Sequence, residues 1–377
     1  LIGDPAVKMA YPEFGMKVTT VNGQSVDGNS ISFKALEKIT VEGEVLDVSG
    51  QLVTDFTGIV NPTVKDSKVT VTCLKNSNKD DSPAFTFTDY PNTIFIGNDS
   101  VRNGKFSFTF TVPKDISYSN LQGKMNLYAV DTESGNEAQG NFDNFIVGGT
   151  SDTAETDTIG PEIRALYLND TTFVDGGQVN TTPYFVAELW DKSGVNITGS
   201  SVGHDMMLVI DESTVLSYNL NSYYELLPGE DGTGIVKFPI PALEPGKHTA
   251  EFWVWDILNN STVRTFTFEV VEGLKPFLFD VIATPGIARE QVTFHLMHNR
   301  PESRMRVGIM VYDLAGRQLW KHEESGTSGL FENYTVSWDL TSGGARMRPG
   351  VYIYRAAIST DNSKDATKAR KFIILGE

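Results

Sequence analysis

The sequence contains almost no cysteine, since Cys73 is the only one among 377 residues. A single thiol excludes an intrachain disulfide framework and a thiolate-rich zinc site. Long apolar runs are missing as well. The sequence has no uninterrupted stretch of about 18 apolar residues, which is the length that a helix needs to cross a bilayer. We therefore expect a chain that does not span a membrane and that holds no cofactor.

Basic residues are also scarce. Lysine and arginine number 31 against 48 acidic residues, which gives a formal net charge of -17. A surface of this sign repels phosphate backbones, so we expect no binding to nucleic acid. The composition, with 40% hydrophobic and 21% charged residues, is that of a folded protein, and the length predicts two to four domains.

Helical periodicity is nearly absent, and strand patterns take its place. Apolar and polar residues alternate in one short segment after another, with Gly, Pro or Asn in the turns between them. The clearest predicted strands are residues 39–45, 69–74, 105–112, 125–130, 184–190, 206–210, 248–255, 265–270, 291–296, 307–312, 334–338, 351–358 and 369–375. The pattern predicts an all-β protein made of β-sandwiches.

A Thr-, Ser-, Asp- and Glu-rich stretch at residues 150–158 marks a domain boundary. The strands before and after it form two related sets, because both Asp131 and Asp256 end a strand and are followed by Asn in the turn. We predict tandem immunoglobulin-like β-sandwich domains and a terminal β-sandwich. The predicted boundaries are 1–15 for the tail of a preceding domain, 16–150, a linker at 151–160, 161–273 and 274–377.

Few residues have the reactivity or the neighbours that catalysis needs. Cys73 alternates with Val69 and Val71, so we predict a thiol packed in a core and no catalytic residue in this chain. His204 and Asp205 are adjacent in a Gly-rich loop, where they are either an acid–base pair or a histidine bonded to backbone carbonyls. The second interpretation is favoured because no motif links a nucleophile to them.

Metal ligands are equally few. His295 and His298 lie on a predicted strand, where their spacing points them to opposite faces. The acidic loops at residues 131–136 and 230–232 offer oxygen atoms, but without the full spacing of an EF-hand. Each is either a calcium loop or a solvated turn, and we favour the turn and predict no metal site.

Three motifs in the last hundred residues form a set. Residues 312–317 read Tyr-Asp-Leu-Ala-Gly-Arg, a Trp-Asp pair follows at 338–339, and residues 349–352 read Pro-Gly-Val-Tyr. With the lysine-rich strand at 368–375, this order resembles the C-terminal signal domain of proteins exported by the type IX secretion system. The residues that carry these hairpin motifs are Gly316, Arg317 and Gly350.

Two further segments resemble one family of that system. Residues 1–12 are similar to the closing segment of a gingipain-type cysteine peptidase domain. The loop at residues 191–205 resembles a loop of the gingipain-type sortase of type IX secretion. The loop positions that carry this resemblance are Asp191, Gly194, Asn196, Gly203, His204 and Asp205.

The resemblance implies that this chain has a non-catalytic role. It would be the non-catalytic scaffold and docking region of a sortase that cleaves C-terminal signal domains from cargo and attaches the cargo to the cell surface. The parent protein would be a cysteine peptidase, and cargo would meet its absent protease domain. The implied location is the cell surface, bound to the outer membrane through the barrel shuttle PorV. The implied docking residues are Lys368, Arg370, Lys371 and Phe372.

Two other functions remain open on the sequence alone. The chain could be the end of a secreted gingipain-like protease whose terminal domain is a cleavable export signal. It could also be an immunoglobulin-like surface adhesin, which exposed aromatic loops such as Tyr223-Tyr224 would favour.

Overall fold

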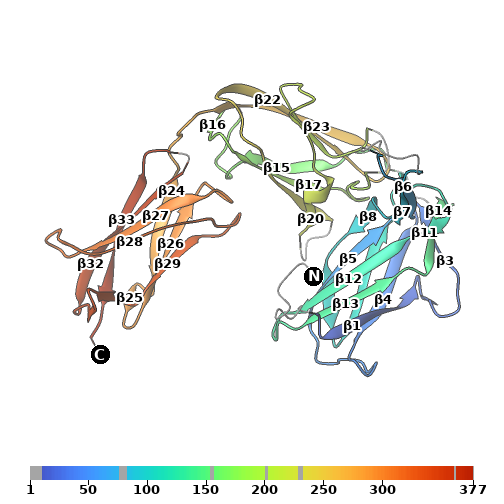
Figure 1. Cartoon of the computed structure of the whole chain (residues 1–377), viewed down its shortest axis with the longest axis horizontal. Helices are drawn as coiled ribbons and strands as arrows, with labels where there is room; N and C mark the ends of the chain where they lie inside the picture. Colours follow the sequence, from blue (N-terminus) through green and yellow to red (C-terminus); the bar gives the residue numbers. More distant parts are fainter. Residues whose placement is uncertain are drawn as a thin grey trace. The chain divides into compact units, whose positions relative to one another are not determined.

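The structure is a computed structural model that describes residues 11–75, 83–152, 157–199, 203–227, 232–360 and 362–376. Strands dominate these residues (Figure 1), whose one helical element is the short 3₁₀ turn η1 (Asn221–Tyr223). The prediction of an all-β protein is therefore confirmed. No described helix is long and apolar enough to cross a membrane.

The chain divides into two compact units. The first contains residues 1–164, 188–236 and 251–264, and the second contains residues 165–187, 237–250 and 265–377. This division passes through the strands of the predicted domain at 161–273, so the domain boundaries stay a prediction. The predicted tail at 1–15 lies mostly outside the described residues, which begin at Tyr11.

The main sheet of the first unit closes on itself. Its strands follow the order β12-β13-β1-β4-β10-β9-β5-β8, and a further pairing of β5 with β12 joins the path into a ring. A smaller sheet has the order β11-β14-β3. The strands are β1 (Phe14–Val21), β2 (Gln24–Ser25), β3 (Ile31–Ala35), β4 (Lys38–Leu46), β5 (Gly58–Lys65), β6 (Val69–Thr72), β7 (Thr86–Asp89), β8 (Thr93–Ile96), β9 (Asp99–Arg102), β10 (Lys105–Thr111), β11 (Leu121–Gln122), β12 (Lys124–Asp131), β13 (Glu137–Phe142) and β14 (Phe145–Thr150).

The core of this sheet is built by period-two alternation. In β10, Phe106, Phe108 and Phe110 are buried while the residues between them face solvent. Successive side chains of a strand point to opposite faces, so these three rings form one row on the inner face. Phe33 stacks on Phe145 with ring centroids 4.3 Å apart, which packs the small sheet against the same core.

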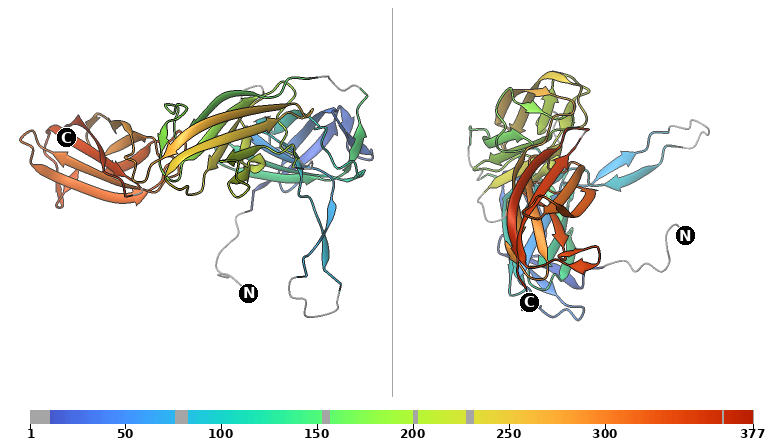
Figure 2. Two further views of the ribbon diagram at one scale, coloured as in Figure 1. Left: turned by 90° about the horizontal axis from the view of Figure 1, so that it is seen from above. Right: turned by 90° about the vertical axis from the view of Figure 1, so that its left-hand side faces the viewer.

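A two-stranded ribbon, β6 paired with β7, stands away from the closed sheet (Figure 2). Cys73 directly follows β6 and is exposed, as are Leu74, which is 84% exposed, and Phe85, which is 71% exposed. The prediction of a core thiol is therefore wrong. Alternation shows which residues share a strand face, but it does not show whether another part of the chain covers that face.

Two further sheets lie between residues 162 and 270. One has the order β15-β17-β21-β20 and the other β16-β23-β22-β18-β19. The strands are β15 (Glu162–Leu168), β16 (Gln178–Val179), β17 (Tyr184–Trp190), β18 (Met207–Ile210), β19 (Ser217–Asn219), β20 (Tyr224–Leu226), β21 (Thr233–Pro239), β22 (Gly246–Trp255) and β23 (Ser261–Val270).

The last hundred residues, all in the second unit, form two sheets with the orders β24-β26-β29 and β25-β33-β32-β27-β28, beside a small β30-β31 hairpin. The indole of Trp338 stacks on Trp320 at 4.5 Å and donates a hydrogen bond to the Thr341 carbonyl at 2.7 Å. The strands are β24 (Leu278–Thr284), β25 (Ile287–Ala288), β26 (Val292–His298), β27 (Met305–Tyr312), β28 (Gln318–Gly326), β29 (Tyr334–Trp338), β30 (Thr341–Ser342), β31 (Ala345–Arg346), β32 (Gly350–Ser359) and β33 (Ala366–Ile374).

The hairpin motifs of this region have the expected local structure. The Asp313 carboxylate accepts the backbone N–H groups of Ala315 and Arg317, and Gly316 has a φ of +82°, which a glycine adopts without strain. Arg317 pairs with Asp313 at 3.2 Å. Gly350 begins β32.

Candidate functional site

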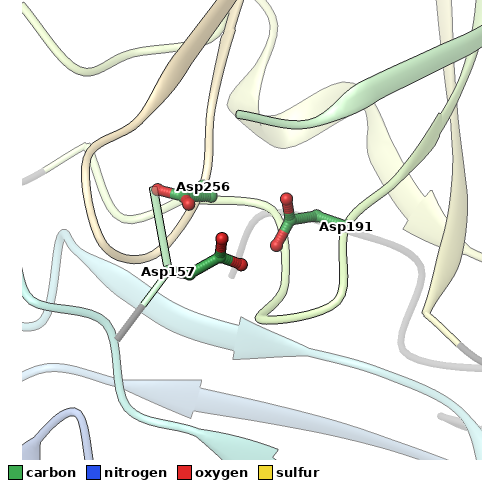
Figure 3. A group of neighbouring side chains, drawn as sticks. All are labelled: Asp157, Asp191 and Asp256. Carbon is green, nitrogen blue, oxygen red and sulfur yellow. The ribbon is translucent and has the colours of Figure 1, made fainter. Parts of the chain in front are cut away.

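Three aspartates from separate segments meet in the first unit (Figure 3). Asp191 directly follows β17, Asp256 directly follows β22, and Asp157 lies shortly before β15. Each offers one carboxylate oxygen, and these three oxygens lie within 4.8 Å of one another. Asp191 and Asp256 are buried and Asp157 is half-buried, so the group is an acidic cluster largely shielded from solvent.

Local turn chemistry places two of these carboxylates. Asp191 accepts the backbone N–H groups of Ser193 at 2.7 Å and Gly194 at 2.9 Å. Asp256 accepts those of Leu258 at 2.9 Å and Asn260 at 2.7 Å. An aspartate at a strand end bonds the backbone of the following turn in this way, as the sequence predicts for Asp256.

The third carboxylate connects the two loops. The Asp157 carboxylate accepts the Ser193 hydroxyl at 2.8 Å and the Ile159 N–H at 3.0 Å. The Asn260 amide donates to the Asp157 backbone carbonyl at 3.1 Å and to the Asp256 carboxylate at 2.6 Å. These bonds hold the segment before β15 against the turns that follow β17 and β22.

The cluster has unusual electrostatics. Burial raises the pKa of Asp191 to about 6 and also raises the pKa of Asp256. The pKa of Asp157 is lowered, chiefly by the hydrogen bond from the Ile159 N–H. The atoms that could coordinate a metal ion here are all carboxylate oxygens, the ligand type that a hard divalent cation such as Ca²⁺ prefers. Sequence reasoning placed its calcium candidates elsewhere, at residues 131–136 and 230–232, and missed this cluster.

Those earlier candidates differ from the cluster. Asp131 accepts the N–H groups of Ser134, Thr57 and Glu133, and these bonds lower its pKa to about 2. In the turn after Asp131 the residue with a left-handed φ is Gly135, and in the related turn after Asp256 it is Asn259, with a φ of 74°. Residues 230 and 231 lie outside the described part of the chain.

A second polar network adjoins the cluster and centres on Asp115, which is buried just beyond β10. Its carboxylate lies 2.6 Å from Nδ1 of His204 and accepts the amide N–H groups of Asn259 at 2.9 Å and Asn196 at 3.4 Å. The backbone N–H of Lys114 also donates to the Ile257 carbonyl at 2.8 Å. Asp115 thus joins the segment after β10 to the loops after β17 and β22.

The partner of His204 differs from the prediction. The expectation was a bond to backbone carbonyls, but the ring contacts the Asp115 carboxylate and packs on Trp255 with centroids 4.5 Å apart. Asp205 accepts the Asn221 amide at 2.8 Å rather than bonding to its neighbour. A carboxylate contributed by a distant segment cannot be read from the residues next to a histidine, which explains the error.

The six loop residues singled out by the resemblance lie in this region. Asp191 belongs to the cluster, Asn196 and His204 contact Asp115, and Gly194 and Gly203 have positive φ values of 114° and 92°. The three positions between Gly199 and Gly203 lie outside the described residues. Gly316, Arg317 and Gly350 belong to the second unit and not to this site.

Of the remaining histidine pair, His298 has a structural role. His298 ends β26, where its Nδ1 accepts the Arg300 N–H at 3.1 Å and its Nε2 bonds the Ser328 hydroxyl at 2.8 Å. Burial lowers the pKa of His298 to about 4. Both nitrogens of the neutral ring are thus hydrogen-bonded, one to Arg300 in the loop after β26 and one to Ser328.

The four residues predicted for docking differ in availability. Lys371 is exposed, Arg370 pairs with Asp280 at 2.9 Å, and Lys368 donates to the Phe279 carbonyl. Phe372 is 2% exposed and packs in the core with Tyr352 and Tyr354. Its side chain does not reach the surface, which corrects its place in the docking set; the three basic residues stay a prediction.

Comparison with known proteins relates the chain to a solved structure. No protein-family model matches the sequence, and no curated protein does. Among solved structures, dimeric latent PorU from Porphyromonas gingivalis is 38% identical over 100% of this chain. The chain is a PorU-related region. It spans 35% of the PorU chain in that structure, and the TM-score is 0.44.

Two other matches have much lower identity than PorU. A tetra-tandem repeat from the extending region of a large adhesion protein is 14% identical, covering 97% of this chain and 74% of that one, with a TM-score of 0.20. The FN1–FN3 domains of chicken CNTN1 are 8% identical, covering 96% and 98%, with a TM-score of 0.19. At these scores the likeness carries no conclusion, so the fold assignment rests on the sheets themselves.

Proposed function

We propose that this chain is the non-catalytic scaffold and outer-membrane docking region of a PorU-type sortase. The parent protein would be a cysteine peptidase that cleaves C-terminal signal domains from cargo of the type IX system and attaches the cargo to the cell surface. The observation that carries the proposal is the 38% identity with PorU over every residue of the chain. A position at the C-terminal side of the protease domain is part of the proposal.

The Asp115 network supports the scaffold part of this proposal. A spacer has to keep a fixed shape, and buried charge-assisted hydrogen bonds define a single arrangement because their loss leaves polar groups unpaired. Here one buried carboxylate holds His204, Asn259 and Asn196 from two loops.

The docking part rests on the basic residues of β33. In a chain of net charge -17, Lys368, Arg370 and Lys371 gather on one strand. The proposed partner is the barrel shuttle PorV, and the proposed location is the cell surface, where the region would hold its parent to the outer membrane. Cargo would be contacted by the protease domain.

A pull-down of the whole chain from detergent-solubilised outer membrane tests the docking. We expect mass spectrometry to identify one barrel protein of the shuttle type, and Lys371→Glu to reduce its capture. Lys38→Glu is the control, because that lysine is exposed on β4 in the other unit. Failure to capture a barrel, where a cargo signal domain does so in parallel, would remove the docking function.

The alternatives make different predictions. A secreted protease with a cleavable export signal would lack residues 275–377 in its mature native form, which intact-mass analysis detects. An adhesin would have exposed aromatic loops, but at Tyr223-Tyr224 Tyr223 is 41% exposed and Tyr224 is buried. This pair therefore does not provide the aromatic surface that the adhesin interpretation needs.

A further inference from the structure

A hollow of about 580 Å³ lies on the outer face of the closed sheet. Strands β5, β12 and β13 form its floor, and Figure 1 shows them side by side. Its volume falls within the range of roughly 300–1,000 Å³ that is usual for small-molecule sites. The hollow belongs wholly to the first unit and is separate from the aspartate cluster.

The strand register arranges its side chains as a grid of two rows. Asn61, Tyr128 and Gln139 lie directly opposite one another on the three strands. Two residues further along, Thr63, Asn126 and Asn141 form the second row. Directly opposite side chains on one face are about 5 Å apart, so six uncharged polar groups converge on the hollow.

The hydrogen-bonding groups of this grid are available. Within the described residues, the side chains of Asn61, Thr63, Asn126, Gln139 and Asn141 make no hydrogen bond to another part of the chain. Comparable cross-strand neighbours elsewhere do bond to each other, as Thr293 does with Ser337 at 2.9 Å. Tyr128 is 38% exposed, and its hydroxyl donates to Glu137 at 2.7 Å, which holds the ring in one orientation.

The surroundings restrict the class of ligand. The three strands have paired neighbours on both sides, so no free edge accepts a peptide as an added strand. Charged residues occur only outside the two rows of the grid, with Lys65 and Lys124 beyond one row and Glu137 beyond the other. Nothing in the grid itself would neutralise an ionic ligand.

We propose that this face, named here the amide grid, binds a neutral oligosaccharide. Sugar hydroxyls both donate and accept hydrogen bonds, and amide side chains offer both functions as well. The apolar face of a pyranose ring packs on an aromatic ring, and Tyr128 lies at the centre of its row to receive it. This inference does not depend on the proposed sortase function.

The test uses the full chain and a panel of neutral tetrasaccharides of glucose, mannose, galactose, rhamnose and N-acetylglucosamine. Saturation-transfer NMR at millimolar sugar identifies a bound probe, and calorimetry then measures its Kd. We expect at least one neutral probe to bind, and Tyr128→Ala and Asn126→Ala each to weaken it by about tenfold, the loss of one good contact. Tyr128→Phe should retain binding within about threefold, because it keeps the ring.

Tyr223→Ala is the matched control, since that tyrosine has a similar exposure and lies in η1, outside the amide grid. It should leave the Kd unchanged. If no neutral probe binds, if a tetramer of galacturonate binds while the neutral ones do not, or if Tyr128→Ala and Tyr223→Ala behave alike, the inference is wrong. Far-UV circular dichroism on each variant checks the fold, and Asn126→Asp, which changes charge without volume, gives a second measurement at the same position.

Discussion

At the scale of single residues, burial changes the chemistry of Asp191 most clearly. The folded chain raises its pKa to about 6, chiefly because burial keeps water from the carboxyl group, with a smaller contribution from the two neighbouring carboxylates. The unfolded chain holds the same group near the ordinary value of about 3.9. Turn geometry at Asp191 could be predicted from its place after a strand, but this pKa could not, since its causes come from distant segments.

The first prediction follows from this pKa. The folded state binds the proton more tightly than the unfolded state, so the stabilisation is complete below about pH 4 and is lost as the pH rises through about 6. Asp191→Asn keeps the oxygen that accepts the Ser193 N–H and removes the charge. We expect the variant to be more stable than the parent at pH 7.5, by at most roughly 3 kcal/mol, and equal to it near pH 4.

Urea denaturation at both pH values, in buffer with a chelator, measures this difference. Asp99→Asn is the control because Asp99 is exposed on β9. Lower stability of the Asp191 variant at pH 7.5 would contradict the pKa argument.

The second prediction concerns Cys73. Its thiol is exposed beside the β6–β7 ribbon, so we expect a disulfide reagent such as DTNB to label it in the native chain as fast as in the chain unfolded in urea. The rate at which the coloured thiolate of the reagent is released at pH 8 measures the labelling. Labelling that requires unfolding would show instead that the thiol is covered.

At the scale of elements, loops rather than strands carry the site. The strands β17 and β22 present Asp191 and Asp256 at their ends, and Asp115 beyond β10 holds the loops that follow. Strand positions such as residues 105–112 were predictable because Phe106, Phe108 and Phe110 alternate with polar residues. The meeting of the loops was not, because no local pattern connects Asp115 with His204.

The third prediction tests this network. Asp115→Ala leaves the buried Asn196 amide without its acceptor, so we expect a loss of about 2–4 kcal/mol in the free energy of unfolding. Hydrogen exchange should accelerate at residues 194–198, 203–206 and 256–260 and stay unchanged in β32. Asp99→Ala serves as the exposed control. A uniform acceleration over both units would argue against a local network.

At the scale of the whole molecule, charge is the property that composition determines. The chain has a formal charge of -17 and few basic residues. Three of them, Lys368, Arg370 and Lys371, lie within four positions of each other on β33. Such a molecule resists association with polyanions whatever its loops do. The same acidity makes the basic strand a distinctive feature for a partner of opposite charge.

The fourth prediction states this as a measurement. We expect no binding of the whole chain to a 20-base-pair DNA duplex at 50 mM salt and tens of micromolar protein, because phosphate contacts need clustered cations. Fluorescence anisotropy of a labelled duplex measures it, with a basic protein as the positive control. A salt-dependent rise in anisotropy would contradict the charge argument.

The sequence by itself determined the strands, the all-β class, the strand-end turns at Asp131 and Asp256, and the relationship to PorU. These features depend on period-two alternation, on the hydrogen bonds of an aspartate to the turn that follows it, and on the order of short motifs along the chain. Only the tertiary structure decided that Cys73 is exposed, that Phe372 is buried, that Asp157 joins the other two aspartates, and that six polar side chains of β5, β12 and β13 form one grid. The physical reason is that burial and proximity depend on which face another segment covers, and a one-dimensional pattern does not contain that information.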